Sequence, residues 1–473
     1  MTHAATRLTP AFAAAPPRRD VLAAALALVW AALVHWPSLN QWGGDDPFYL
    51  EVGRLWLAGA PPYLNAFDVK PPGFFALVAA TEALFGAAPV ALSRLATVCD
   101  AGTAFCLWRL GSQLGAPRVG TFAAVSFPLL SLTLADNAGY PPLALATSLA
   151  FAAFCGGGPL VRRAALAGLA IGAAGMIKQT AVFEAVALAW AFAREPVETR
   201  AKLWALAAFA LAAAFPTLAF AGYFAAKGAL PLMLDDAVIR ALQRPAMQNE
   251  DLADVLAHLR RVVTPVAPLV AFAVWGAARA PRERQVLGAW FLAALLELIV
   301  QHARWMGYLG PALAPMLLLT GFVVISRPAL RAMAGIMVVG LGLIAVIPAL
   351  NAGRERADAL KGAAAAIRAR DPTPQDRLLG LGDGALLNAN LGLAPPTPYF
   401  YWMHLLCDFP GAGPDRLREA LEARPRFVVA PEARAPVFCE SAQAQAILEQ
   451  ALVSYRRLGE ATPLVVYERV DKQ

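Results

Sequence analysis

Residues 40–75, NQWGGDDPFYLEVGRLWLAGAPPYLNAFDVKPPGFF, directly follow the first apolar segment of the chain. This stretch contains an acidic pair (Asp45 and Asp46), a short helix-like segment, several aromatic residues and a Lys-Pro-Pro-Gly turn that begins at Lys70. Most of the sequence after it is apolar. We therefore expect the chemistry in this polar loop, and we expect the remainder of the chain to hold the loop in place.

The composition is that of an integral membrane protein. The chain has 473 residues, of which 59% are hydrophobic and 15% charged, whereas soluble domains carry roughly 25% charged residues. The net charge of +7 does not indicate a nucleic-acid partner, because the basic residues form no single patch. They lie in short clusters between apolar segments, as the positive-inside rule predicts for membrane proteins.

Eleven apolar segments approach the length of about 20 residues that a membrane span requires. They are 21–37, 91–112, 118–135, 141–157, 162–177, 179–193, 202–226, 262–278, 285–301, 307–325 and 329–349. Segment 73–87 is also apolar, but it is short and follows Pro-Pro-Gly. We therefore predict that it lies in the interface or re-enters the membrane, and that it does not cross it.

Lys and Arg residues set the predicted orientation in a bacterial cytoplasmic (inner) membrane. With the N-terminal tail 1–20 in the cytosol, every short cytosolic turn of an eleven-span chain is basic. Counting 73–87 as a span would reverse every later turn and break this pattern. Loop 38–90 and the C-terminal tail are therefore both expected on the outer face.

Two further outer regions are predicted. Segment 230–261 alternates apolar and charged residues at helical spacing, which is typical of amphipathic helices on a membrane surface. From residue 351 to 473 the composition becomes that of a soluble protein. There the strand-like runs RLLGLG, RFVVA and PLVVYERV alternate with helical stretches near 354–370, 414–424 and 441–457.

These patterns predict a mainly α-helical, polytopic membrane protein with a small α/β domain on the periplasmic face. Cys407 and Cys439 both fall in that domain. They are candidates for a disulfide if the domain lies outside the cytosol.

Asp45 and Asp46 allow two interpretations. Acidic residues before Pro47 can simply favour the start of a helix. Alternatively, a carboxylate at the membrane surface can act as a general base. Lys70 is similarly ambiguous: two following prolines stiffen its backbone for phosphate binding, but a lysine can also extend to lipid head groups.

Other polar residues lie near the predicted outer ends of spans. Lys178 and Gln179 occupy a tight turn between two apolar segments, where a charge is a functional hypothesis by default. The alternative for each of these residues is an ordinary loop or interfacial side chain. The remaining candidates are Arg94, Asp136, Asn137, His302 and Arg304.

The order of motifs in the first loop resembles that of the bacterial GT-C glycosyltransferases. The elements are Gly44-Asp45-Asp46, Tyr49, Gly59-Ala60-Pro61-Pro62-Tyr63 and Lys70-Pro71-Pro72-Gly73. They look most like those of the group that includes protein O-mannosyltransferases and lipid A aminoarabinose transferases. Arg94, Lys178-Gln179-Thr180 and Tyr308 also match, and the resemblance covers about residues 1–350 by segment order.

This resemblance implies a GT-C-like transmembrane domain over 21–350 that acts as a hexosyl- or pentosyltransferase. The sugar would pass from a polyprenyl-phosphate donor to a lipid, glycan or protein acceptor on the outer face. Asp45 would be the catalytic base, with Asp46 and Asp136 as further acidic residues, and Lys70, Arg94 and Lys178 would bind the donor phosphate. The substrate pocket would include Tyr49, Tyr63, Asn137, Gln179, His302, Arg304 and Tyr308.

No compact ligand cluster is visible in the sequence, so a divalent cation such as Mg²⁺ or Mn²⁺ is compatible with this mechanism but not required. A transporter or flippase for a lipid-linked saccharide is a rival reading. Transporters commonly show inverted repeats, whereas no repeat is visible here. A catalytically silent, lipid-binding paralogue is a second rival, because the sequence departs from the family pattern at Asp136 and Pro398.

Overall fold

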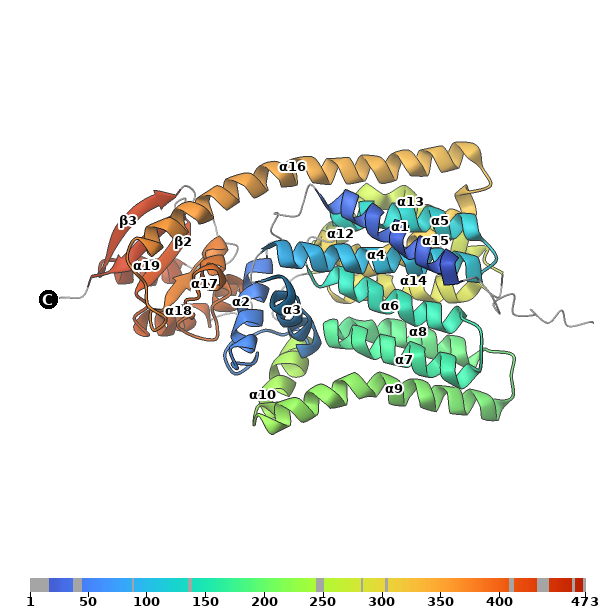
Figure 1. The fold of residues 1–473 in the computed structure, drawn as a ribbon, viewed down its shortest axis with the longest axis horizontal. Coiled ribbons are helices and arrows are strands. Elements are labelled where there is room, and N and C mark those ends of the chain that lie inside the picture. The colour runs from blue at the N-terminus through green and yellow to red at the C-terminus, as the bar shows by residue number, and fades with distance from the viewer. Residues whose placement is uncertain are drawn as a thin grey trace, which may run out of the picture.

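The computed structural model is mainly helical, with one small sheet near the C-terminus (Figure 1). It describes residues 17–36, 45–86, 89–134, 138–243, 251–281, 284–302, 305–407, 412–431, 442–461 and 464–470. A helical bundle occupies one end of the long axis and the sheet the other end. Helices α2 and α3 lie between the two.

Each of the eleven predicted spans coincides with a helix or part of one. In an apolar solvent a helix satisfies its own backbone hydrogen bonds, so apolar runs of this length fold as helices. Five helices in the described ranges are long and apolar enough to cross a membrane, by length and composition. The chain is thus a multi-pass membrane protein. The helices that lie in the eleven predicted spans are α1 (Pro17–His35), α4 (Pro89–Gln113), α5 (Pro117–Leu134), α6 (Tyr140–Cys155), α7 (Leu160–Ile177), α8 (Val182–Ala193), α9 (Thr199–Ala226), α13 (Ala267–Ala278), α14 (Gln285–Val300), α15 (Gly310–Val324) and α16 (Pro328–Arg368).

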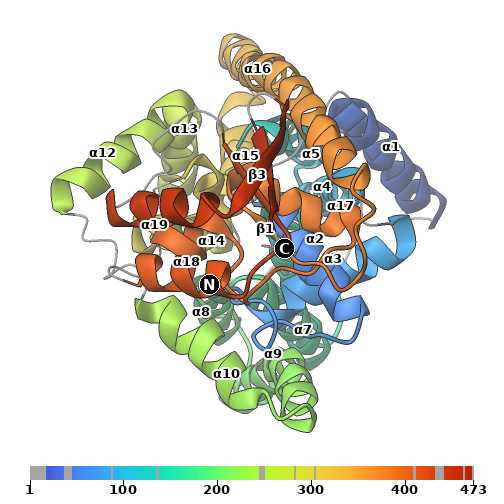
Figure 2. The same ribbon diagram turned by 90° about the vertical axis from the view of Figure 1, so that its left-hand side faces the viewer.

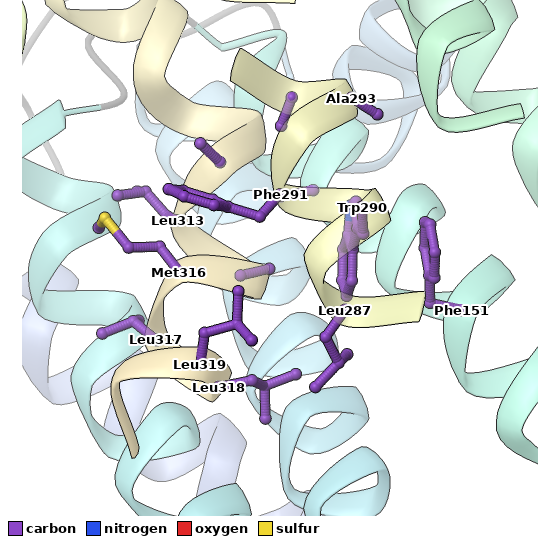
Figure 3. Packing of buried hydrophobic residues seen from close by; sticks show 14 of the residues in the cluster. Phe151, Leu287, Trp290, Phe291, Ala293, Leu313, Met316, Leu317, Leu318 and Leu319 are labelled. Carbon is purple, nitrogen blue, oxygen red and sulfur yellow. The ribbon is translucent and has the colours of Figure 1, made fainter. Parts of the chain in front are cut away.

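Helix α15 forms the centre of the bundle. Its residues Leu313 and Met316 are fully buried, and Figure 3 shows the ring of Phe291 from α14 reaching towards Leu313. On the other face of α14, the ring of Trp290 stacks on Phe151 of α6 at a centroid distance of 4.1 Å. This packing fixes α14, which carries polar residues at its C-terminal end.

Close backbone contact joins α7 and α9. Gly168 and Gly172 lie against the carbonyl oxygens of Phe209 and Ala213, where a Cβ atom would clash. Small residues spaced four apart allow membrane helices to approach in this way. The contact sets the position of α7, whose last residue precedes Lys178.

The first outer loop forms α2 (Asp46–Leu57) and α3 (Pro72–Phe85). Pro47 and Pro72 each lie in a first turn, where proline is favoured. Helix α3 has 14 residues, or about 21 Å, and is shorter than the roughly 30 Å of a hydrocarbon core. Helix α8, which lies in a predicted span, has only 12 residues, so length does not test the prediction that α3 stays out of the membrane.

The outer segment after α9 consists of α10 (Leu230–Leu234), a π-helical turn (Asp235–Arg240) and α12 (Leu252–Val263). Asp251 caps α12 in a capping box with Asp254. Helix α12 continues through a 3₁₀ turn (Thr264–Val266) into α13. Figure 2 shows α12 at the periphery of the bundle.

The tail contains a four-stranded sheet in the order β1-β2-β4-β3. Strand β1 (Leu378–Gly380) is parallel to β2 (Phe427–Pro431), and β4 (Leu464–Arg469) is antiparallel to β2 and β3 (Tyr455–Ala461). Alternate residues bury opposite faces: Phe427 packs towards α16, and Val428 packs towards α18 (Gly413–Glu422). Two further helices are α17 (Leu386–Leu391) and α19 (Ala442–Leu452).

Two sequence-based boundaries were wrong. The span 329–349 and the helix near 354–370 are one helix, α16, of 41 residues. The helix expected over 441–457 ends at Leu452, because the following residues pair with β4 as strand β3. Among the other strand predictions, the three quoted runs each contain a strand. The side chains of Cys407 and Cys439, the candidates for a disulfide, lie outside those that the structure describes.

Candidate active site in the first outer loop

Asp45 lies at the N-terminal end of α2, but its carboxylate makes no capping hydrogen bond to that helix. Instead it accepts a hydrogen bond from Tyr49 Oη (2.8 Å) and another from Tyr401 Oη of the tail. The simple capping interpretation therefore does not describe the position of this carboxylate. Asp46 is the acidic residue in the first turn of the same helix.

Lys70 lies on the other side of Tyr49. Its ammonium is 4.7 Å from the centroid of the Tyr49 ring and 3.7 Å from Asp68 Oδ2. The Lys70 backbone is fixed on both sides, since its N–H donates to Asp68 Oδ1 (2.8 Å) and its carbonyl accepts from Tyr63 Oη (2.7 Å). One tyrosine side chain thus contacts both the proposed base and a lysine.

A cluster of buried aromatic side chains packs beneath these residues. Phe48 and Tyr49 of α2 pack against Phe74 and Phe75 of α3, and Phe48 stacks on Tyr401 at 4.9 Å. Aromatic pairs in this geometry add stability beyond the burial of their area. The packing holds the tail against the loop, so that residues 356 positions apart share one hydrogen bond.

Lys178 forms a second polar cluster in the turn between α7 and α8. Its ammonium donates to Tyr140 Oη (2.7 Å) and lies 4.3 Å and 4.6 Å from the ring centroids of Tyr140 and Tyr308. It is also 3.6 Å from Glu297 Oε1. Cations over aromatic faces are held electrostatically, so Tyr140, Tyr308 and Glu297 fix the position of this charge.

The fully buried Glu297 of α14 was missed in the sequence analysis. It accepts hydrogen bonds from Thr180 Oγ1 (2.6 Å) and Gln301 Nε2 (3.1 Å). Glu184 of α8 is also fully buried. The signal was available, because a carboxylate inside an apolar segment is a functional hypothesis by default.

Gln179 connects the two clusters. Its Nε2 donates to the carbonyl oxygen of Val69 (2.6 Å), next to Lys70, and to that of Ala237 (2.7 Å) in the outer segment. The turn that carries Lys178 is therefore hydrogen-bonded to the loop that carries Lys70. Both lysines belong to one connected region at the end of the bundle.

Charged residues of the outer segment and the tail also meet the loop. Arg240 donates to Asp235 (2.8 Å), lies 3.2 Å from Asp236 and stacks over Phe67 at 5.5 Å. Burial raises the pKa of Asp236 to about 7, and Arg240 opposes this shift.

The guanidinium of Arg416 in the tail lies over Tyr399 at 4.0 Å and over Phe67 at 5.7 Å. The sequence analysis did not select Arg240, Asp236 or Arg416 as site residues.

The other predicted site residues are less central or fall outside the described ranges. Arg94 is exposed, and its guanidinium lies 5.2 Å from the ring centroid of Phe85. His302 follows α14 with a positive φ of 55° and is half-buried. Asp136, Asn137 and Arg304 lie outside the described residues.

In the described ranges, no three His, Cys, Asp or Glu side chains come together in a way that could hold a metal ion. The involvement of Mg²⁺ or Mn²⁺ stays an untested prediction.

Comparison by sequence finds no match to a family model or to a curated protein. Comparison of structures finds several. ArnT from Cupriavidus metallidurans bound to undecaprenyl phosphate superimposes with a TM-score of 0.68 at 16% identity, over 97% of this chain and 99% of that one. The apo state of the same protein gives 0.59 at 15% identity, over 97% and 100%.

A third similar structure is the arabinofuranosyltransferase AftD from mycobacteria. It matches with a TM-score of 0.51 at 15% identity, over 96% of this chain and 40% of that chain. At such identities the likeness establishes the fold. The chain has the GT-C fold of membrane glycosyltransferases, as its resemblance to that family implied.

Proposed function

We propose that this GT-C-fold membrane protein transfers a sugar from a polyprenyl-phosphate donor to an acceptor at the outer face of the cytoplasmic membrane. One observation carries the proposal: two tyrosine hydroxyls hold the Asp45 carboxylate, and the ring of one of them contacts the Lys70 ammonium. A base and a cation thus lie together in the loop at the end of an apolar bundle.

Asp45 acts as the general base in this mechanism. Its carboxylate removes a proton from an acceptor hydroxyl or amine while that group attacks the anomeric carbon. Tyr49 and Tyr401 orient the carboxylate through their hydrogen bonds. Direct displacement by the acceptor inverts the anomeric configuration. Asp46 and Asp136 remain further acidic candidates.

Lys70 and Lys178 stabilise the departing polyprenyl phosphate. Charge develops on the phosphate oxygens as the glycosidic bond breaks, and fixed cations lower the energy of that state. The Lys70 and Lys178 side chains are 25% and 20% exposed, so both remain accessible to a ligand at the surface of the site. ArnT, a structural neighbour, was solved with undecaprenyl phosphate, which supports a lipid phosphate as the ligand here.

The remaining predicted pocket residues act through these groups. Tyr308 and Gln179 position Lys178, and Tyr63 positions the backbone of Lys70. Arg94, at the start of α4, is retained as a candidate for the outer edge of the donor site. The apolar helices beneath the loop offer a surface for the isoprenoid chain.

The decisive experiment uses the purified protein in lipid with polyprenyl-phosphate sugars and measures release of polyprenyl phosphate. Asp45→Asn should lower the rate at least about 100-fold, the scale of general-base catalysis. The control is Asp415→Asn, an exposed residue of α18 that pairs with Arg418. Lys70→Met should lower kcat, because the lost cation stabilises charge that develops as the glycosidic bond breaks.

Two results would contradict parts of the proposal. Unchanged activity in Asp45→Asn would remove the base assignment and leave the transfer reaction standing. Movement of labelled lipid-linked sugar across vesicles without release of polyprenyl phosphate would instead identify a transporter.

A further inference from the structure

A cavity of about 170 Å³ lies at the opposite end of the bundle from the candidate active site. It is formed by the C-terminal ends of α13 and α15 and by the chain that leads into α14. Arg284 lies just before α14, whereas Glu297 lies near that helix's last turn, about 20 Å further along its axis. The cavity is therefore separate from the site around Asp45.

Three guanidinium groups line this cavity. Arg279 and Arg327 lie 5.1 Å and 4.7 Å from the ring centroid of Trp275. Arg284 lies 4.1 Å from the ring centroid of Phe322. The aromatic rings hold the three positive charges around one space.

Within the described residues, none of these three arginine side chains forms an ion pair or a hydrogen bond. Their charges are therefore uncompensated by protein groups that the structure describes. Guanidinium groups present several N–H donors in a fixed plane and match the oxygens of a phosphate. Like charges gathered around one cavity favour an anionic ligand within it.

Apart from Ser326, the rest of the described cavity wall is apolar. Leu319 and Val323 of α15 line it, and Gly276 of α13 lies so close to the Leu319 carbonyl that a Cβ atom would clash. The close approach of the two helices sets the floor of the cavity. A phospholipid bound here would have its phosphate beside the basic groups and its acyl chains along the apolar helix surface.

We propose that this cavity binds the phosphate of an anionic phospholipid head group. Basic pockets between membrane helices on the cytoplasmic side are suited to such lipids. The orientation predicted from the basic turns places this end of the bundle in the inner leaflet. The proposal does not depend on the glycosyl transfer reaction.

The test measures lipid retention by native mass spectrometry and thermal stability of the full chain in nanodiscs. Discs contain phosphatidylcholine alone or with phosphatidylglycerol. The wild type should retain phosphatidylglycerol and melt at a higher temperature in its presence. The double variant Arg279→Gln/Arg327→Gln should weaken retention about tenfold or more, since each basic residue contributes to binding.

The matched control is Arg162→Gln/Arg194→Gln. It removes the same charge from turns predicted on the same face, and Arg194 also stacks on a tryptophan, Trp190. Equal retention in the two double variants would overturn the proposal, because the effect would then be one of net charge. If inorganic phosphate stabilises the protein as much as phosphatidylglycerol does, the ligand is a free anion and the lipid proposal is wrong.

A second variant guards against loss of folding. Ser326 lines the cavity and is exposed, so Ser326→Asp adds a repulsive charge without filling the core. Its melting temperature in phosphatidylcholine should match that of Ser326→Asn. The aspartate variant should lose the stabilisation by phosphatidylglycerol, and retention of that stabilisation would contradict the site.

Discussion

At the scale of single residues, the side chains at the site have both near partners, such as Tyr49 for Asp45, and partners distant in sequence. Asp45, Lys70 and Lys178 could be selected from the sequence because each is a charged group beside an apolar segment. Their distant partners could not, because Tyr401 reaches Asp45 across the fold and Glu297 reaches Lys178 from another helix. Sequence spacing does not determine such contacts between distant elements.

The pairing of Lys178 with Glu297 leads to a first prediction. Glu297→Gln removes the carboxylate charge that lies 3.6 Å from the ammonium, so the melting temperature should fall by several degrees. Lys178→Met/Glu297→Gln should recover most of that loss, because the double variant removes both members of the pair, but activity should stay low. Thermal unfolding and polyprenyl phosphate release measure the two effects, and additive losses of stability would contradict the pairing.

A buried carboxyl pair between α2 and α3 makes stability depend on pH. Burial and, to a smaller extent, nearby Glu51 raise the pKa of Glu82 from 4.5 to about 8, while Arg54 opposes the shift. Burial likewise raises the pKa of Glu51 to about 7, against its ion pair with Arg54. Between pH 4.5 and 8 the folded chain therefore holds protons that the unfolded chain releases.

The free energy of unfolding should consequently decrease as pH rises through this range. Glu82→Gln removes one of the two groups, so its melting temperature should fall less between pH 5 and pH 9 than that of the wild type. Glu419→Gln, an exposed residue of α18, is the control. An identical slope in wild type and Glu82→Gln would show that this carboxyl does not gain protons on folding.

At the scale of elements, the ends of helices decide the geometry of the site. Apolar length and Pro-Pro-Gly were enough to predict that α3 is short, whereas the orientation inferred from the basic turns stays a prediction. The continuity of α16 was not predictable, because the change to soluble composition near residue 351 resembles a break. Helical hydrogen bonds continue through that change in side chains.

The contact between α3 and α7 gives a prediction at this scale. A Cβ atom on Gly73 would lie 2.6 Å from Met176 Cβ and 2.7 Å from its carbonyl oxygen, two residues before Lys178. Gly73→Ala should therefore displace the Lys178 turn, cost about 1–3 kcal/mol in stability and raise KM for the donor.

The control is Gly335→Ala in α16, where no atom lies within 4 Å of the added Cβ. It should leave both stability and KM close to the wild-type values. If Gly73→Ala behaves like Gly335→Ala, the contact does not position the lysine.

At the scale of the whole molecule, the fold brings three regions to one end of the bundle: the first loop, the outer segment and the tail (Figure 1). Composition predicted each region separately. It did not predict that Phe67, Arg240 and Arg416 would meet. Their meeting places the tail and the first loop on the same side of the membrane.

Cysteine labelling tests this arrangement. In a variant without native cysteines, Glu449→Cys in α19 should react with a membrane-impermeant maleimide in intact spheroplasts. Glu198→Cys, before α9, should react only after permeabilisation. Labelling of Glu449→Cys only after permeabilisation would place the tail in the cytosol and overturn the eleven-span topology.

The 41-residue helix α16 also has an entropic consequence. It tethers the tail to the bundle along about 60 Å without a flexible linker. A stiff tether keeps the effective concentration of Tyr401 near Asp45 high. Little conformational freedom is then lost when the two groups meet, so the carboxylate is preorganised before any donor or acceptor arrives.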